Sequence, residues 1–106
     1  INPLVKGHTL VVPKREVDYI FDLEDEEVGA MQIFAKSVAA AIRQAFPCLK
    51  VGQAVIGLEV PHAHIHLIPI QKASEMLFSN PKLRLSSDEF AAIAKAINEA
   101  WENNRK

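Results

Sequence analysis

Three histidines alternate with other residues in the segment 60–70, and this alternation constrains the local structure more than any other feature of the chain. The segment reads Val60-Pro61-His62-Ala63-His64-Ile65-His66-Leu67-Ile68-Pro69-Ile70. Successive side chains of a β-strand point to opposite faces of a sheet. A strand here would place His62, His64 and His66 on one face and apolar side chains on the other. The sequence therefore predicts a strand with one reactive face and one core face.

Such a row of imidazoles is an accident of sequence, a metal site or a catalytic row, and accident is the weakest of the three. Neutral imidazole is the commonest metal ligand. At about 3.3 Å rise per residue, however, the backbones of His62 and His66 lie roughly 13 Å apart, so three rings do not easily share one tetrahedral ion. Two of them could do so if His8, Cys48 or a carboxylate supplied the other ligands.

The catalytic interpretation follows from the chemistry of histidine, which is both a nucleophile and a proton donor near neutral pH. The pattern His-x-His-x-His followed by two apolar residues is formed by His62, His64, His66, Leu67 and Ile68. With it, the chain resembles the histidine triad (HIT) proteins of the Hint branch, which act on nucleoside phosphoramidates and dinucleoside polyphosphates. The segment 6–14, KGHTLVVPK, resembles the family's strand with a fourth histidine, here His8. The resemblance extends from residue 1 to about residue 70.

The resemblance implies a mechanism that needs no metal or other cofactor. His64 would attack the α-phosphorus and form a nucleotidyl-imidazole intermediate that water then hydrolyses, while a backbone carbonyl near His62 would fix the tautomer of the attacking ring. His62 and His66 would hold phosphate oxygens, and His8 would complete the polar cluster. The positions that would bind the rest of the substrate are Ile1, Leu10, Gly57 and Glu59.

The segment just before the triad departs from the family's pattern. The family commonly has Asn-Gly and Gly-Gln steps there, but this chain has no asparagine between Leu49 and His62, and Leu58-Glu59 replaces a usual Gln-Ser or Gln-Thr step. A carboxylate beside a bound phosphate is unfavourable unless it is protonated, acts as an acid or points away. Two classes of function stay open: a hydrolase of phosphoramidates or dinucleoside polyphosphates, and a nucleotide- or metal-binding module with little turnover.

The remaining segments predict an α+β fold, with an antiparallel sheet, one long helix and a C-terminal helix. Apolar runs at 9–12 and 53–58 predict two strands, and the second is close enough to the histidine strand to pair antiparallel with it. Apolar residues three or four apart predict a helix over 24–46 that covers the core face of the sheet. The segment 72–85 is predicted to be a loop, and the capping-box spacing at 86–89 predicts the start of the last helix.

Length, charge and cysteine content fit one domain, residues 1–106, in a reducing compartment. The net charge of −1 provides no basic footprint for nucleic acid. One cysteine, Cys48, excludes an internal disulfide. Because neither a signal peptide nor an apolar run of about eighteen residues is present, we expect a soluble cytoplasmic protein without a membrane partner.

The resemblance also implies a segment before Ile1 and an assembly of two subunits. Family members have further residues there, including a helix and a strand or hairpin. A sheet this small leaves an exposed edge that must be paired or covered. We therefore expect a homodimer in which the helix 24–46 packs on its counterpart, since Ala39, Ala40 and Ala41 are small enough to let another backbone approach.

Overall fold

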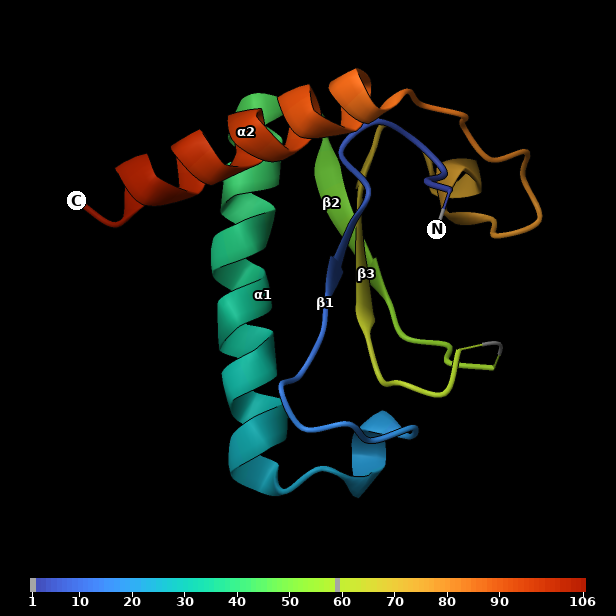
Figure 1. Ribbon diagram of the computed structural model, residues 1–106, viewed down its shortest axis with the longest axis vertical. Coiled ribbons are helices and arrows are strands. Elements are labelled where there is room, and N and C mark those ends of the chain that lie inside the picture. The colour runs from blue at the N-terminus through green and yellow to red at the C-terminus, as the bar shows by residue number, and fades with distance from the viewer. Residues whose placement is uncertain (1, 59) are drawn as a thin grey trace.

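The computed structural model describes residues 2–58 and 60–106, so the predicted substrate-binding positions Ile1 and Glu59 lie outside the described residues. Three strands and two long helices form the fold (Figure 1). In chain order the elements are β1 (Thr9–Val11), a 3-10 turn (Ile20–Asp22), α1 (Asp25–Ala45), β2 (Lys50–Ala54), β3 (Ile65–Ile70), a second 3-10 turn (Ala73–Met76) and α2 (Ser87–Asn104). No helix of the described residues combines the length and apolarity needed to cross a bilayer.

The sheet has the order β1-β3-β2, with both neighbours antiparallel to the central strand β3. Antiparallel residue pairs alternate between pairs that exchange two hydrogen bonds and pairs that exchange none. Pro69 has no N–H, so its pair with Val51 cannot be of the first kind. The backbone N and C=O of Pro69 therefore point toward β1, where Pro69 has no N–H to donate. The pairing of β1 with β3 stops before that position, at Thr9 with Leu67. The proline therefore explains why β1 is short, and Gly7, at φ +94°, turns the chain there.

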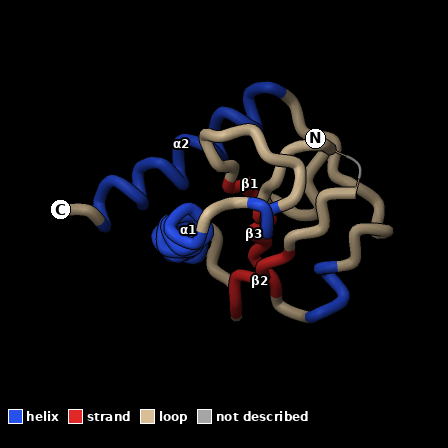
Figure 2. The backbone as a smooth tube through the Cα atoms, turned by 90° about the horizontal axis from the view of Figure 1, so that it is seen from below, coloured by secondary structure: helices blue, strands red, loops and turns tan. Residues whose placement is uncertain are grey.

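The helix α1 covers one face of the sheet, as the sequence predicted. Viewed along its axis in Figure 2, α1 lies beside the strands, and most of the loops lie beyond them. The core formed between helix and sheet includes Met31, Ala35, Val38 and Ile42 from α1 and Val11, Ile65 and Leu67 from the strands. This packing fixes which face of β3 is apolar, and His66 consequently projects from the other face.

The second helix crosses one end of α1 (Figure 1). Trp101 attaches it there, since its indole N–H donates to Ser37 Oγ at 3.1 Å and its ring lies edge-on to Phe34 at 6.0 Å. Its start agrees with the sequence, because Ser86 and Glu89 form the predicted capping box.

Two strand predictions were wrong in their limits. The strand predicted over 53–58 is Lys50–Ala54, and the histidine strand begins only at Ile65, so His62 and His64 lie in the connection before it. The physical reason is local: Gly57 has φ +71°, which no strand residue adopts, and Ala63 N–H donates to Val17 O at 2.6 Å instead of pairing with β2. The segment predicted as a loop also contains the 3-10 turn Ala73–Met76.

Candidate active site

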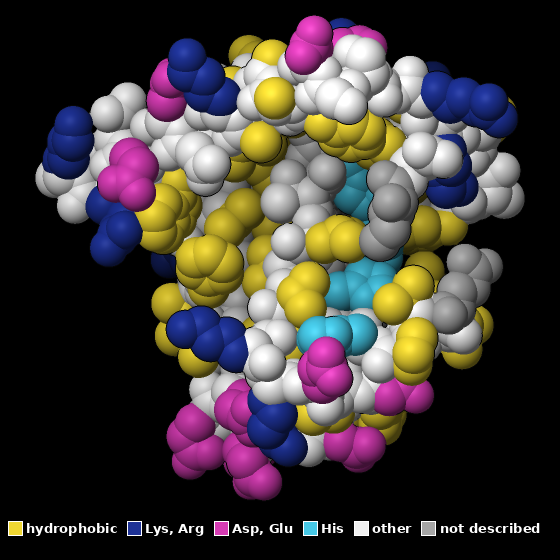
Figure 3. Space-filling model, viewed as in Figure 1, with side chains coloured by type: hydrophobic (Ala, Val, Ile, Leu, Met, Phe, Trp, Pro, Cys, Tyr) yellow, Lys and Arg dark blue, Asp and Glu magenta, His cyan; other side chains and the backbone are white. Residues whose placement is uncertain are grey.

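A cavity of about 320 Å³ contains three of the four histidines. It lies against the face of the sheet opposite α1, and the space-filling view shows histidine side chains gathered in one hollow region beside apolar ones (Figure 3). Its lining consists of Asn2, His8, Ile56, Gly57, Leu58, Val60, His64, His66, Phe78 and Lys82. The site thus combines the segment before β1, the connection before β3, β3 itself and the segment after the second 3-10 turn.

Hydrogen bonds connect the three rings in one chain. His8 Nε2 lies 2.9 Å from His66 Nδ1, and His66 Nε2 lies 3.1 Å from His64 Nε2. Backbone groups terminate the chain on both sides: the Leu4 N–H donates to His8 Nδ1 at 2.9 Å, and His64 Nδ1 lies 2.7 Å from the carbonyl oxygen of His62. Every ring nitrogen of the three therefore has a partner.

The two backbone groups decide the tautomer of each ring. A backbone N–H only donates, so neutral His8 carries its proton on Nε2 and donates it to His66. His66 then carries its proton on Nε2 and donates to His64 Nε2. A carbonyl oxygen only accepts, so His64 must be protonated on Nδ1, which again leaves a lone pair on Nε2. The assignments made from the two ends agree, and all three rings are neutral in this arrangement.

His62 is used differently from the expectation that its ring holds phosphate. Its Nε2–H donates to the carbonyl oxygen of Pro13 at 3.3 Å, and its ring does not line the cavity. The reason is that His62 precedes the strand, where the alternation of faces no longer applies. Its backbone carbonyl performs the orienting role that the resemblance implied, because it accepts the Nδ1–H of His64.

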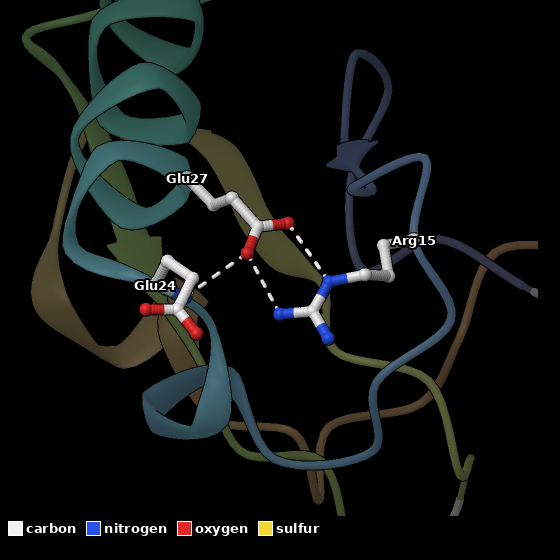
Figure 4. A network of polar contacts seen from close by, with 3 residues as sticks. All are labelled: Arg15, Glu24 and Glu27. Atoms are coloured by element: carbon white, nitrogen blue, oxygen red, sulfur yellow. Dashed lines mark hydrogen bonds and ion pairs between the residues drawn. The ribbon is translucent and has the colours of Figure 1, made fainter.

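The segment 13–17 holds the His62–His64 connection in place. Pro13 O accepts from the ring of His62, and Val17 O accepts from Ala63 N–H. Arg15 fastens this segment to the start of α1 through two hydrogen bonds to the Glu27 carboxylate, at 2.7 and 3.0 Å (Figure 4). Glu27 Oε1 also accepts from the backbone N–H of Glu24 at 3.0 Å, so the same carboxylate caps the helix.

Burial disfavours the charged forms of His66 and His8. Desolvation is the main cause that lowers the pKa of His66 to about 4, and His64 and His8 lower it further. Burial and the nearby charge of Lys82 also lower the pKa of His8. His66 is only 8% exposed. Burial therefore favours the neutral imidazole at both His66 and His8, beside the ammonium group of Lys82.

The other expected binding positions separate into two groups. Gly57 lines the histidine cavity. Leu10 instead lines a hollow of about 330 Å³ between β1 and α2, so the structure does not bring it into the cavity. The cavity also contains Asn2, Phe78 and Lys82, which the sequence did not predict as site residues, because they lie in irregular segments without periodicity. Only the positive charge of Lys82 could have indicated a phosphate-binding role.

The arrangement of nitrogens is unsuited to a shared metal ion. Both nitrogens of His66 are engaged by neighbouring rings, whereas a metal needs a free lone pair on each ligand. Cys48, which sequence analysis considered as a further ligand, does not line the cavity. Within residues 2–58 and 60–106, no three His, Cys, Asp or Glu side chains are grouped to hold a metal ion.

The antiparallel sheet covered by one long helix, with linked histidines on its opposite face, defines a protein of the histidine triad class. Residues 1–73 match the HIT domain family, and the chain belongs to that family.

Relatives with named activities include adenosine 5′-monophosphoramidase of Saccharomyces cerevisiae. It is 33% identical over 99 residues, which cover 92% of this chain and 63% of the relative. Asymmetrical bis(5′-nucleosyl)-tetraphosphatase of Schizosaccharomyces pombe is 25% identical over 115 residues, or 100% of this chain and 62% of the relative. The chain thus spans less than two thirds of the length of these curated relatives.

Solved structures agree on the fold. The structure of the NitFhit protein of Caenorhabditis elegans superposes with a TM-score of 0.76 at 30% identity, covering 94% of this chain and 24% of the other. A histidine triad nucleotide-binding protein of Sulfolobus tokodaii gives a TM-score of 0.79 at 22% identity, covering 96% and 74%. The second likeness supports the fold alone.

Proposed function

We propose that this protein is a metal-independent nucleotidyl hydrolase that cleaves a nucleoside phosphoramidate or a related adenylate-type substrate through a nucleotidyl-His64 intermediate. The observation that carries the proposal is the 2.7 Å hydrogen bond between His64 Nδ1 and the His62 carbonyl. It fixes the proton on Nδ1 and leaves the Nε2 lone pair in the cavity, as an imidazole nucleophile requires. The activities named for the yeast relatives support the same class of reaction.

In the first step, His64 Nε2 forms a bond to the α-phosphorus while the bond from phosphorus to the leaving nitrogen or oxygen breaks. The leaving atom takes the electron pair of that bond. The Nε2–H of His66, which donates to His64 Nε2 in the free site, loses this acceptor and becomes available to a phosphoryl oxygen or to the leaving atom. In the second step, a water oxygen bonds to phosphorus and the bond from phosphorus to Nε2 breaks. The electron pair of that bond returns to His64, the water gives up a proton, and a nucleoside monophosphate leaves.

The rival function is a nucleotide-binding module with little turnover. The unusual segment before the triad favours it, since Leu58 stands in the cavity wall where the family usually has glutamine. Mass spectrometry after brief incubation with adenosine 5′-phosphoramidate separates the two functions, with a His64→Ala variant as the matched control. We expect an AMP adduct on the wild-type protein and none on the variant. Binding of AMP without any adduct or turnover would favour the module.

Metal independence has a separate test. Turnover should survive exhaustive treatment with EDTA, because the proposed charge stabilisation comes from imidazole N–H groups. Activity that is lost with EDTA and restored by zinc would support the metal alternative.

We further propose a homodimer in a reducing, cytoplasmic environment. Within the described residues β2 has one neighbour in the sheet, and this edge supports the dimer. The exposed apolar side chains of Leu49, just before β2, and of Ile33 on α1 support it as well, at 63% and 73% exposure. The lone thiol of Cys48 fits the reducing compartment. The net charge of −1 offers nothing to a nucleic acid, so a nucleotide is the proposed partner.

A further inference from the structure

We propose that Lys82 determines substrate specificity by binding the phosphate of an anionic leaving group. Lys82 would then raise activity on nucleotidyl substrates that expel a polyphosphate and leave activity on substrates that expel an uncharged amine almost unchanged. This inference rests on the proposed function, because it concerns the group that departs when His64 attacks.

Lys82 carries a formal charge into the cavity that the three linked histidines share. Among the described residues it is the only Lys or Arg that lines the space containing His8, His64 and His66. Its positive charge faces His8 closely enough to lower the pKa of that ring. An anion that enters the cavity would therefore meet one fixed cation, and that cation lies beside the histidines.

The ammonium group of Lys82 is held by its own loop. It donates to the carbonyl oxygens of Phe78 and Asn80, the latter at 3.0 Å. An ammonium has three N–H groups, so one stays available to the cavity. The loop is itself fastened over the site, since the Phe78 ring lies edge-on to His66 at 4.7 Å and Leu83 N–H donates to Pro3 O at 2.8 Å. Lys82 is thus positioned before substrate arrives.

The chemistry of the leaving group makes this cation selective. When the His64–phosphorus bond forms and a bridging P–O bond breaks, the electron pair stays on the bridging oxygen, and the departing polyphosphate gains one negative charge. A positioned ammonium stabilises that charge without transferring a proton. An amine leaving group instead departs after it has gained a proton, so it carries no negative charge for the cation to stabilise. Lys82 should therefore act on one substrate class and not on the other.

The kinetic test compares two substrates and three variants. We expect Lys82→Gln to lower kcat/KM for diadenosine tetraphosphate about 10- to 100-fold, the range for one lost hydrogen bond between charged groups. The same variant should change kcat/KM for adenosine 5′-phosphoramidate less than about threefold. Lys82→Arg keeps the charge and should retain most of the activity. The matched control is Lys36→Gln, an exposed position on α1. Equal losses on both substrates, or no loss on the tetraphosphate, would overturn the proposal.

A binding experiment tests Lys82 even if the protein turns over neither substrate. In a His64→Ala background, calorimetry with AMP and ATP reports phosphate recognition without chemistry. We expect Lys82→Gln to weaken ATP about tenfold or more and AMP little, while Lys36→Gln changes neither. Unchanged ATP affinity would exclude the role of Lys82. Absent adduct and absent turnover in the wild-type protein, with the ATP effect intact, would overturn the hydrolase and leave the anion site standing.

Discussion

The two ring nitrogens of His64 have different kinds of partner, and this difference determines what the ring does. At Nδ1 the partner is a carbonyl oxygen, which accepts a hydrogen bond from the ring. At Nε2 the partner is His66, which donates a hydrogen bond to the ring. His62 contributes its backbone to this arrangement, while its side chain fastens the connection to Pro13. In the proposed mechanism the three histidines of the motif therefore have three roles: His64 is the nucleophile, His66 donates a hydrogen bond to it, and His62 orients it through its backbone carbonyl.

Side-chain substitutions should separate these roles. We expect His64→Ala to lower kcat by several orders of magnitude while AMP still binds, because the attacking atom is gone. His62→Ala keeps the orienting carbonyl and should cost far less, about 30-fold at most. Both values come from steady-state kinetics with adenosine 5′-phosphoramidate. Equal losses of kcat for the two variants would indicate that the ring of His62 binds the phosphate after all.

Burial of His66 should make the protein less stable in mild acid. The ring stays neutral in the folded protein down to about pH 4 but takes up a proton near pH 6.5 in the unfolded chain. Between these values the unfolded chain binds more protons, so stability falls as the pH falls from 6.5 to 4. One pKa unit corresponds to about 1.4 kcal/mol, and the loss from this group is therefore up to about 3 kcal/mol.

Thermal unfolding across this pH range measures the effect. His64 and His8 face His66, and Lys82 lines the same cavity. The pKa of His8 is lowered as well, so its titration changes stability in the same direction. A His66→Asn variant should therefore show a flatter but still sloping curve. Glu27 contributes to the slope only at the acid end of this range, because Arg15 lowers its pKa to about 2 and its contribution is lost as the pH falls from 4.5 toward 2. A wild-type curve that is flat from pH 6.5 to 4 would contradict the assigned shift.

At the scale of elements, the site depends on the irregular segments as much as on the strands. The loop with Phe78 covers the histidine chain, since its ring lies 4.7 Å from His66 and 6.4 Å from His8. We expect Phe78→Ala to expose His66 and raise its pKa from about 4 toward 6.5, because burial is the main cause of the shift. NMR titration of the imidazole signals checks this, with the exposed Phe21→Ala as the control. An unchanged pKa would mean that the sheet alone desolvates the ring.

The contrast between regular elements and irregular segments also explains how much of the fold and site the sequence could predict. Periodicity predicted α1 to within one residue at each end, because a helix repeats its apolar positions over several turns, and the capping-box spacing predicted the start of α2. The alternation of histidines correctly predicted a strand but extended it over His62 and His64, which contacts with the segment 13–17 withdraw from the sheet. Those contacts join residues almost fifty positions apart, and no local pattern records them. Lys82 and Phe78 were missed for the same reason.

At the scale of the molecule, the open question is which surface a second subunit would use. The sequence suggested Ala39, Ala40 and Ala41, but Ala41 is fully buried and Ala39 packs against the core of its own subunit. Within the described residues, β2 has one neighbour in the sheet, and Gln53 at its free edge is hydrogen-bonded to Gln32 of α1 at 2.8 and 2.9 Å. The edge of β2 is therefore a better candidate than the small residues of the helix.

The hydrogen-bonding register of β2 and β3 shows which backbone N–H groups of β2 point outward, and this provides a direct test of that edge as the interface. Since Val51 opposite Pro69 cannot form a doubly bonded pair with β3, Gln53, two residues further on, also directs its backbone N–H away from β3. Gln53→Pro removes this outward N–H without removing a bond inside the sheet. We expect light scattering at micromolar concentration to give twice the chain mass for the wild type and for Gln53→Ala, and the mass of one chain for folded Gln53→Pro. A wild-type mass of one chain would exclude the dimer, and a dimeric Gln53→Pro would place the interface away from β2.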